Sequence, residues 1–315
     1  MRLFGMTPVE TVHQARLKRR HLLAVALVGA CAGKPTKETH STMPTTTTSS
    51  GASGAAMRSG HASVNGISMY YEIHGDGASL PLVLLHGGGS TIGSTYGRIL
   101  PFFVRHRTVI ALEEQGHGRT SDRDAPVRFT TSADDVAALL SELRVPRADV
   151  MGFSNGASVA MQVAIRHPAL VQKLVFASSM TKRSGAAPQF WKIFDTASFE
   201  NMPQALKDAF LEVNPDPVKL RRMHDKDLER MKHFVDTSDD DVRALTAPTL
   251  VLLGDRDVPT PEHGVELTHL IPNSRLMILP GGHGDYLGEI AVGKDRSRSA
   301  EVTAALIEDF LDQSS

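Results

Sequence analysis

Short, continuous apolar runs recur along the chain from residue 82 onward. Runs of this kind are typical of strands that are buried on both faces of a sheet. They cover residues 82–85, 108–112, 149–151, 173–177, 249–253 and 275–279. Because helical patterns alternate with these runs, we expect an α/β fold with a mostly parallel, doubly wound sheet that is covered by helices on both sides.

Two further segments that suit strands precede these runs and flank the dipeptide Asn65-Gly66. This dipeptide is preferred in two-residue hairpin turns, because both residues tolerate a positive φ. Residues 62–64 and 67–73 are therefore predicted to form a β-hairpin. The folded domain is expected to span residues 61–315.

Side-chain spacing predicts two helices. The first has apolar side chains at the i, i+4 and i+7 positions of one helix face, which are Val136, Leu140 and Leu143. Ser132 and Asp135 form a capping-box pattern that places the start of this helix. The second helix is predicted over residues 156–167, which are rich in small side chains.

Residues 178–247 interrupt the alternation of strands and helices. Aromatic and methionine side chains lie among charged residues there, and their spacing fits four helices of modest length. We expect a helical lid insertion over about residues 183–245. Most of its apolar residues should form the insertion's own core, and two or three should face a substrate. Trp191 from the insertion and Phe153 from the main domain are the candidate substrate-binding residues.

The N-terminal segment is basic over residues 1–20 and apolar over residues 22–30, and it leads to Cys31, the only cysteine of the chain. This pattern predicts a signal peptide over residues 1–30, too short in its apolar part to span a bilayer. Its end resembles the cleavage site of bacterial lipoproteins, where the cysteine carries the lipid. The alternative is an incidental or buried cysteine. The export route stays open between the general secretory and the twin-arginine pathways.

We therefore expect an exported lipoprotein that is anchored to the outer membrane or cell envelope through a lipid on Cys31. Residues 31–60 are rich in Thr, Ser and Gly and predict a flexible tether. The whole chain of 315 residues has a formal net charge of −1, which gives no field that favours nucleic acid. The sequence carries no prediction of the oligomeric state.

The pentapeptide Gly152-Phe153-Ser154-Asn155-Gly156 follows a predicted strand and opens a predicted helix. A strand-to-helix turn this sharp requires glycine on either side, and it exposes the serine hydroxyl above the sheet. Ser154 is therefore the candidate nucleophile. The alternative is a glycine-rich turn in which the serine is incidental.

A serine nucleophile requires a base, and position selects His283 among 14 histidines. His283 lies in a glycine-rich loop after the last predicted strand, at the same edge of the sheet as Ser154. The acid that orients the base should follow the preceding strand, where Asp255 and Asp257 both stand. Asp257 is preferred because it lies farther past the strand end, and Asp255 is expected to hold the turn.

Other histidines have local explanations in the sequence. We expect His86 to be a structural residue of the glycine loop that follows residues 82–85. His117 is assigned to a glycine turn, His167 to a helix end and His224 to a solvated surface of the lid.

The loop His86-Gly87-Gly88-Gly89 follows a buried strand, which is the position of the oxyanion-loop motif. The backbone N–H groups of Gly88 and Asn155 are the expected donors to a developing oxyanion. The chain has no H-E-x-x-H, C-x-x-C or phosphate-loop motif, so neither a metal nor a cofactor is implied.

Taken in order, these motifs resemble the α/β-hydrolase superfamily over roughly residues 62–314. They include Glu113 to Thr120, the sequence Arg166-His167-Pro168 and the sequence Gly254-Asp255-Arg256-Asp257. The resemblance is closest to small bacterial esterase- or lactonase-like members with a helical lid. It implies Ser154, Asp257 and His283 as a catalytic triad, with backbone donors near Gly88 and Asn155.

The chain departs from the usual D-x-R-G-x-G-x-S pattern of this superfamily at Glu113, Gln115 and Thr120, which affects the loop beside the pocket. Ser154 argues against members that use an aspartate nucleophile. The expected activity is hydrolysis of a small-molecule ester or lactone through an acyl-enzyme. A perhydrolase or acyl transferase with the same triad, and a binding module without turnover, are the alternatives.

Overall fold

A computed structural model of the protein describes residues 57–292 and 298–313. The predicted signal peptide, Cys31 and nearly all of the predicted tether lie outside the described residues. None of the helices within the described ranges is long and apolar enough to cross a membrane.

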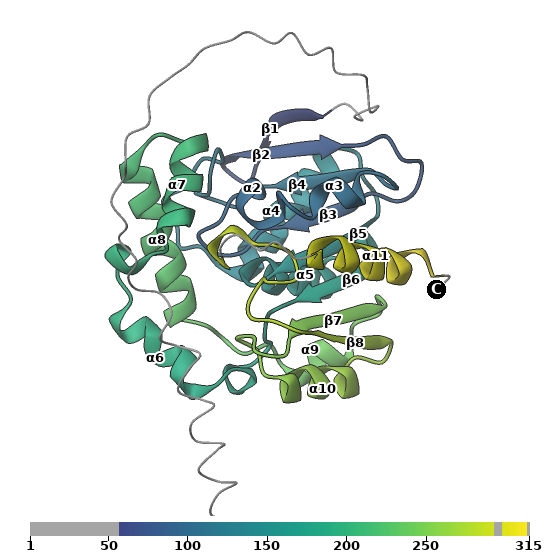
Figure 1. Ribbon diagram of the computed structural model, residues 1–315. Helices are drawn as coiled ribbons and strands as arrows, with labels where there is room; N and C mark the ends of the chain where they lie inside the picture. Colours follow the sequence, from purple (N-terminus) through teal and green to yellow (C-terminus); the bar gives the residue numbers. More distant parts are fainter. Residues whose placement is uncertain (1–56, 293–297, 314–315) are drawn as a thin grey trace, which may run out of the picture. The chain divides into compact units, whose positions relative to one another are not determined.

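An eight-stranded sheet forms the centre of the domain, with the strand order β1-β2-β4-β3-β5-β6-β7-β8 (Figure 1). The strands are β1 (Arg58–Val64), β2 (Ile67–His74), β3 (Leu82–Leu85), β4 (Val109–Leu112), β5 (Ala148–Phe153), β6 (Val171–Ala177), β7 (Thr249–Gly254) and β8 (Ser274–Leu279). The pairs β1–β2 and β2–β4 are antiparallel, and the remaining pairs are parallel. The predicted mostly parallel α/β sheet is confirmed.

Helices cover the sheet and fill the connections between strands. The α-helices are α2 (Ile92–Tyr96), α3 (Leu100–Phe103), α4 (Phe129–Glu142), α5 (Asn155–Arg166), α6 (Pro188–Thr196), α7 (Gln204–Val213), α8 (Pro217–Lys232), α9 (Asp239–Arg243), α10 (Pro261–Leu270) and α11 (Ser299–Asp312). Short 3-10 helices are η1 (Pro168–Leu170), η2 (Arg183–Gly185), η3 (Phe199–Asn201) and η4 (Ile290–Val292).

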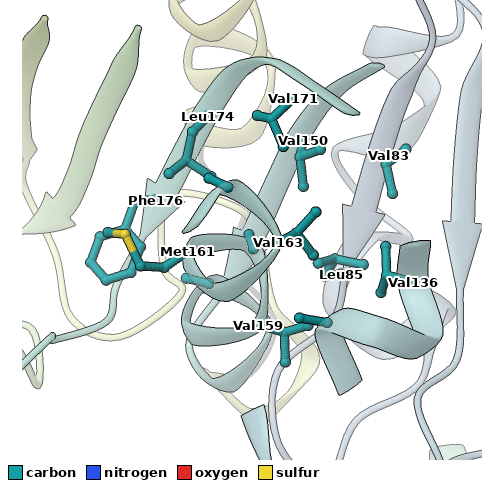
Figure 2. Packing of buried hydrophobic residues seen from close by; sticks show 14 of the residues in the cluster. Val83, Leu85, Val136, Val150, Val159, Met161, Val163, Val171, Leu174 and Phe176 are labelled. Atoms are coloured by element: carbon teal, nitrogen blue, oxygen red, sulfur yellow. The ribbon is translucent and has the colours of Figure 1, made fainter. Parts of the chain in front are cut away.

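Strand β3 shows why the strands read as continuous apolar runs. Leu82 and Leu84 face one apolar layer, built with side chains of α2, α3 and α11. Val83 and Leu85 face the other layer, built with side chains of α4 and α5. Figure 2 shows strand side chains of this second layer meeting those of the helices. Since successive side chains of a strand point to opposite faces, a strand covered on both sides must be apolar at every position.

The insertion between β6 and β7 is helical and contains α6 to α9. Figure 1 shows α6, α7 and α8 along one side of the sheet. Part of the insertion packs on itself through a small apolar cluster of Met202, Leu206, Phe210, Leu220 and Met223. This agrees with the expected helical lid insertion.

Two local boundaries differ from the sequence predictions. Helix α4 begins at Phe129 and not at Ser132, so the predicted capping box is wrong. The Asp135 carboxylate lies inside the helix, where it pairs with Arg123 at 2.5 Å. Strand β1 begins at Arg58, and the last residues assigned to the tether therefore pair with β2 in the sheet.

Candidate active site

Ser154 stands at the sharp turn between β5 and α5, and its backbone is strained. Its φ is 55°, which a non-glycine residue adopts only at an energetic cost of about 1–3 kcal/mol. A Cβ atom at Gly152 would lie 2.1 Å from the Gly156 carbonyl oxygen, and one at Gly156 would lie 2.2 Å from the Leu85 carbonyl oxygen. The flanking glycines are thus required by close backbone packing.

A chain of hydrogen bonds joins the three residues that the sequence selected. The Ser154 Oγ atom lies 3.0 Å from His283 Nε2, and His283 Nδ1 lies 2.7 Å from Asp257 Oδ1. Asp257 follows β7 and His283 follows β8, so adjacent parallel strands deliver both side chains to one edge of the sheet. With the proton on His283 Nδ1, Nε2 is free to accept the Ser154 proton.

The Asp257 carboxylate is buried and accepts several hydrogen bonds. Besides His283, it accepts from the N–H of Gly254 at 2.9 Å, from the N–H of Val258 at 2.7 Å and from the Ser178 hydroxyl. Burial acts to raise the pKa of Asp257, but His283 and these donors outweigh it, so the pKa is lowered. Asp257 is therefore anionic at neutral pH, as a partner for an imidazolium must be.

Ser178 and Tyr286 were not selected from the sequence. The Tyr286 hydroxyl lies 2.5 Å from Ser178 Oγ, and Ser178 in turn donates to Asp257. Burial raises the pKa of Tyr286 well above its ordinary value, so the phenol keeps its proton and donates. The fold brings Tyr286 to Ser178 and so to Asp257, and no pattern in the sequence indicates this contact.

Asp255 has a different environment. Its Oδ1 atom accepts from the N–H of Gly281 at 2.7 Å, which ties the turn after β7 to the loop that carries His283. The structure therefore places Asp257, and not Asp255, beside the imidazole.

The predicted oxyanion donors lie at the same cavity as Ser154 and His283. Asn155 is the first residue of α5, where the helix dipole favours negative charge. Within the described part of the chain, neither the Gly88 nor the Asn155 N–H has a hydrogen-bond acceptor. A Cβ atom at Gly88 would lie 2.3 Å from Asn155 Nδ2, so the two residues are in close contact. Both amides are thus available to a ligand oxygen.

His86 is a structural residue of the glycine loop, as expected. Its Nε2 atom accepts from the N–H of Glu114 at 3.1 Å, and Nδ1 therefore carries the proton that is donated to the Gly87 carbonyl at 2.8 Å. Burial, followed by the charge of His117, lowers the pKa of His86. The ring stays neutral and fixes the loop.

The assignment of His117 to a local glycine turn is corrected by the structure. His117 is buried, and its Nε2 atom lies 3.0 Å from Oδ2 of Asp227, which belongs to the lid helix α8. Arg230, one turn farther along α8, pairs with Glu114 at 2.9 Å and with Asp227 at 2.7 Å. We call Glu114, His117, Asp227 and Arg230 the lid–loop cluster. In the sequence, only the i, i+3 spacing of Asp227 and Arg230 indicates part of the lid–loop cluster.

The prediction for His224 is also corrected. Instead of facing solvent, this side chain is 13% exposed and lines the cavity that contains Ser154. Its ring packs edge-on against Phe199 with the centroids 5.5 Å apart, and its Nδ1 atom lies 2.9 Å from Asp225. The lid therefore places a histidine close to the site, which its position in a charged helix concealed.

The cavity above Ser154 has a volume of about 380 Å³ and is walled mainly by apolar side chains. The apolar lining consists of Met180, Phe190, Ile193, Phe194, Ala197, Met202, Pro203, Leu206, Leu228, Met231, Phe234 and Val258. Its charged or titratable lining is limited to His224, Asp227 and His283 among the described residues, and neither lysine nor arginine is present. A larger groove of about 1320 Å³, lined by α8 and by residues 124–130, contains neither Ser154 nor His283.

The predictions for both candidate substrate-binding residues are corrected by the structure. Phe153 is buried beneath the site, with its ring 4.8 Å from that of His283, and it does not line the cavity. Trp191 is also outside the lining, because its indole N–H donates to the Arg183 carbonyl and its ring stacks under the Arg183 guanidinium. The neighbouring Phe190 and Phe194 face the cavity instead.

A family model described as the alpha/beta hydrolase fold matches residues 81–216 of this chain, which include Ser154 and the oxyanion loop. A solved structure of an N-acyl homoserine lactone degrading enzyme superposes with a TM-score of 0.60 at 26% identity, over 79% of this chain and 99% of that one. The chain is a member of the α/β-hydrolase superfamily.

Two curated hydrolases are similar to the chain in sequence. The 2-hydroxymuconate semialdehyde hydrolase of Pseudomonas sp. (strain CF600) is 33% identical over 112 residues, 34% of this chain and 39% of that protein. The 2-hydroxy-6-oxo-2,4-heptadienoate hydrolase of Pseudomonas putida is 27% identical over 241 residues, 66% of this chain and 83% of that protein. The chain thus spans about two fifths of the length of the first relative and most of the second.

Proposed function

We propose that the protein is a serine hydrolase that cleaves a carboxylic ester or lactone whose acyl portion is uncharged and apolar. One observation carries the proposal: Ser154, His283 and Asp257 form a continuous hydrogen-bond chain that opens into an apolar cavity. A serine activated in this way attacks carbonyl carbon, and adjacent unpaired amides stabilise the oxyanion that results.

The proposed reaction has two halves. His283 Nε2 takes the Ser154 proton as Oγ bonds to the carbonyl carbon, and the N–H groups of Gly88 and Asn155 hold the oxyanion. The C–O bond then breaks, and His283 returns the proton to the departing alcohol oxygen. Water, deprotonated by His283, next attacks the acyl-enzyme, and the acid is released as His283 returns the proton to Ser154 Oγ. Asp257 stabilises the imidazolium in both halves.

The lining of the cavity favours an uncharged substrate over the substrates in the names of the two curated relatives. A muconate semialdehyde and a heptadienoate both carry a carboxylate, which requires a cationic partner when it is buried. The described lining provides no lysine or arginine that could pair with such a carboxylate. We therefore favour cleavage of C–O bonds in neutral esters or lactones over cleavage of C–C bonds in carboxylated dienones.

A panel of substrates tests this proposal. Neutral acyl esters of graded chain length and neutral lactones should be hydrolysed, and a carboxylated dienone of similar size should not be. A fluorophosphonate probe should label wild-type protein once, and it should not label Ser154→Ala. Preferred cleavage of the carboxylated dienone would contradict the substrate class, and labelling of Ser154→Ala would contradict the site.

We also propose that the domain is exported and anchored through a lipid on Cys31. The support is the order of basic residues, apolar residues and the single cysteine over residues 1–31. A Thr- and Ser-rich tether before β1 would let the active site stand clear of the membrane surface.

A further inference from the structure

A carboxylate of the lid contacts the loop that carries the proposed oxyanion donor. Asp227 lies on α8, 138 residues after Gly89, and its Oδ2 atom accepts the N–H of Gly89 at 2.7 Å. A Cβ atom at Gly88 would lie 3.2 Å from the same oxygen. The carboxylate is thus packed against Gly88 and Gly89 in the loop that faces Ser154.

A second path of contacts leads from α8 to the other end of this loop. Arg230 Nη1 lies 2.9 Å from Glu114 Oε2, and the N–H of Glu114 donates to His86 Nε2. His86 in turn donates to the carbonyl of Gly87. The lid helix therefore holds the loop at Gly87 through Arg230 and at Gly89 through Asp227.

The contacts between α8 and the loop are buried, so they favour one position of the lid over others. The side chains of Arg230, Glu114 and His117 are no more than 2% exposed. Withdrawal of α8 would leave these groups unpaired, and a buried charge without its partner is strongly destabilising. Two acidic and two basic residues make up the lid–loop cluster, so the docked lid adds no net charge beside the oxyanion site when His117 is protonated.

We propose that Asp227 is a positioning residue, which holds the Gly87–Gly89 loop so that the Gly88 N–H faces the Ser154 side of the cavity. Docking of the lid helix and completion of the oxyanion hole are then one event. This inference rests on the proposed serine hydrolase function. Asp227 acts through Gly88 and takes no part in the reaction itself.

The test compares Asp227→Asn with Glu229→Gln, an exposed carboxylate on the same helix. Kinetics with a neutral aryl ester should show kcat reduced between about tenfold and a hundredfold in Asp227→Asn. An amide loses the charge that pairs with His117 and Arg230, so the loop shifts and the Gly88 donor is displaced but not removed. KM should stay within about twofold of wild type, since the apolar walls are unchanged. Glu229→Gln should match wild type in both parameters.

Inhibition by a boronic acid that forms a tetrahedral adduct on serine provides a second measurement. A merely structural role of Asp227 would leave the inhibition constant unchanged. The inhibition constant should rise in Asp227→Asn by the same factor as kcat falls, because both report the oxyanion hole. If Asp227→Asn does not fold, His117→Gln replaces it in the same assays. That variant should show a smaller change in the same direction, since the bond from Gly89 to Asp227 remains.

The outcomes separate the inference from the function on which it rests. A folded Asp227→Asn variant with wild-type kcat and boronate affinity would overturn the positioning role and leave the hydrolase proposal intact. A rise in KM at constant kcat would also overturn it, because it would show a direct substrate contact. Wild-type protein that neither hydrolyses esters nor reacts with a fluorophosphonate would overturn both.

Discussion

The Nδ1 atom of His283 lies 2.7 Å from Oδ1 of Asp257, and this contact distinguishes between the two aspartates that follow β7. Asp255 is two residues away in sequence, yet it accepts the N–H of Gly281. One carboxylate is thus placed to orient the imidazole and the other to fix the loop that presents it. The two residues should respond very differently to loss of charge.

Asp257→Asn should keep the fold and lower kcat by about 10⁴-fold, because an amide cannot stabilise the imidazolium and favours the wrong tautomer. Asp255→Asn should lower kcat by less than about tenfold, since an amide oxygen still accepts from Gly281. Ester hydrolysis by both variants at neutral pH is the measurement. If Asp255→Asn proved the more severe change, the acid would be misassigned.

Gly88→Ala should impair the oxyanion hole. The new methyl group would lie 2.3 Å from Asn155 Nδ2, so the loop or the Asn155 side chain must move. We expect kcat to fall by about a hundredfold, the range found when an oxyanion donor is lost. Gly93→Ala is the matched control, because the nearest atom to its Cβ would be 3.9 Å away. Equal activity of the two variants would argue against Gly88 as a donor.

His117 should stabilise the native state on the acid side of neutrality. Burial acts to lower the pKa of His117, but the charge and hydrogen bond of Asp227 outweigh it, so the pKa is raised. The stabilisation is then complete below the unfolded pKa of about 6.5 and is lost as the pH rises through the folded pKa. The lowered pKa of Asp227 keeps its carboxylate charged down to below about pH 4.

Urea denaturation of wild type and His117→Gln measures this contribution. The difference in free energy of unfolding should be about 2–4 kcal/mol near pH 5.5 and should shrink towards pH 9. His167→Gln, which affects the exposed pair with Asp134, should change the free energy by less than about 1 kcal/mol. A difference that grows with pH would show that His117 is neutral in the native protein.

Cys31→Ser should release the protein from membranes without loss of activity. Multiple acyl chains at an N-terminal cysteine hold a protein firmly, at about 0.8 kcal/mol for each buried CH₂ group. Full-length protein from a bacterial host should enter the detergent phase, and Cys31→Ser should stay in the aqueous phase. Intact mass gives the decisive reading: an unmodified chain that still carries residues 1–30 would refute the lipid anchor.

The sheet and the positions of Ser154, His283 and Asp257 followed from the sequence because local rules govern them. Buried parallel strands must be apolar, and their carboxyl ends meet at one edge, so residues that follow β5, β7 and β8 converge. The start of α4 was misplaced because Asp135 pairs with Arg123, which precedes the helix, and does not cap it. A capping-box pattern alone does not reveal a partner outside the helix.

The position of the lid over the sheet was harder to predict, because it depends on contacts between residues that are distant in sequence. Asp227 and His117 are separated by 110 residues, and each looks like a surface or turn residue by itself. Trp191 was selected for its size, yet Phe190 and Phe194 occupy the cavity wall because of the rotation of α6. Helical periodicity identifies a buried face, but it does not say whether that face meets a core or a substrate.

The rate of ester hydrolysis by Ser154→Ala tests the central claim most directly. The hydroxyl supplies the nucleophile and little packing, so the variant should fold with a circular dichroism spectrum and melting temperature close to those of wild type. Its kcat with a neutral aryl ester should be below about a thousandth of the wild-type value, the remainder coming from the oxyanion hole and binding. Retention of more than about a tenth of wild-type turnover would contradict the assignment of Ser154 as the nucleophile.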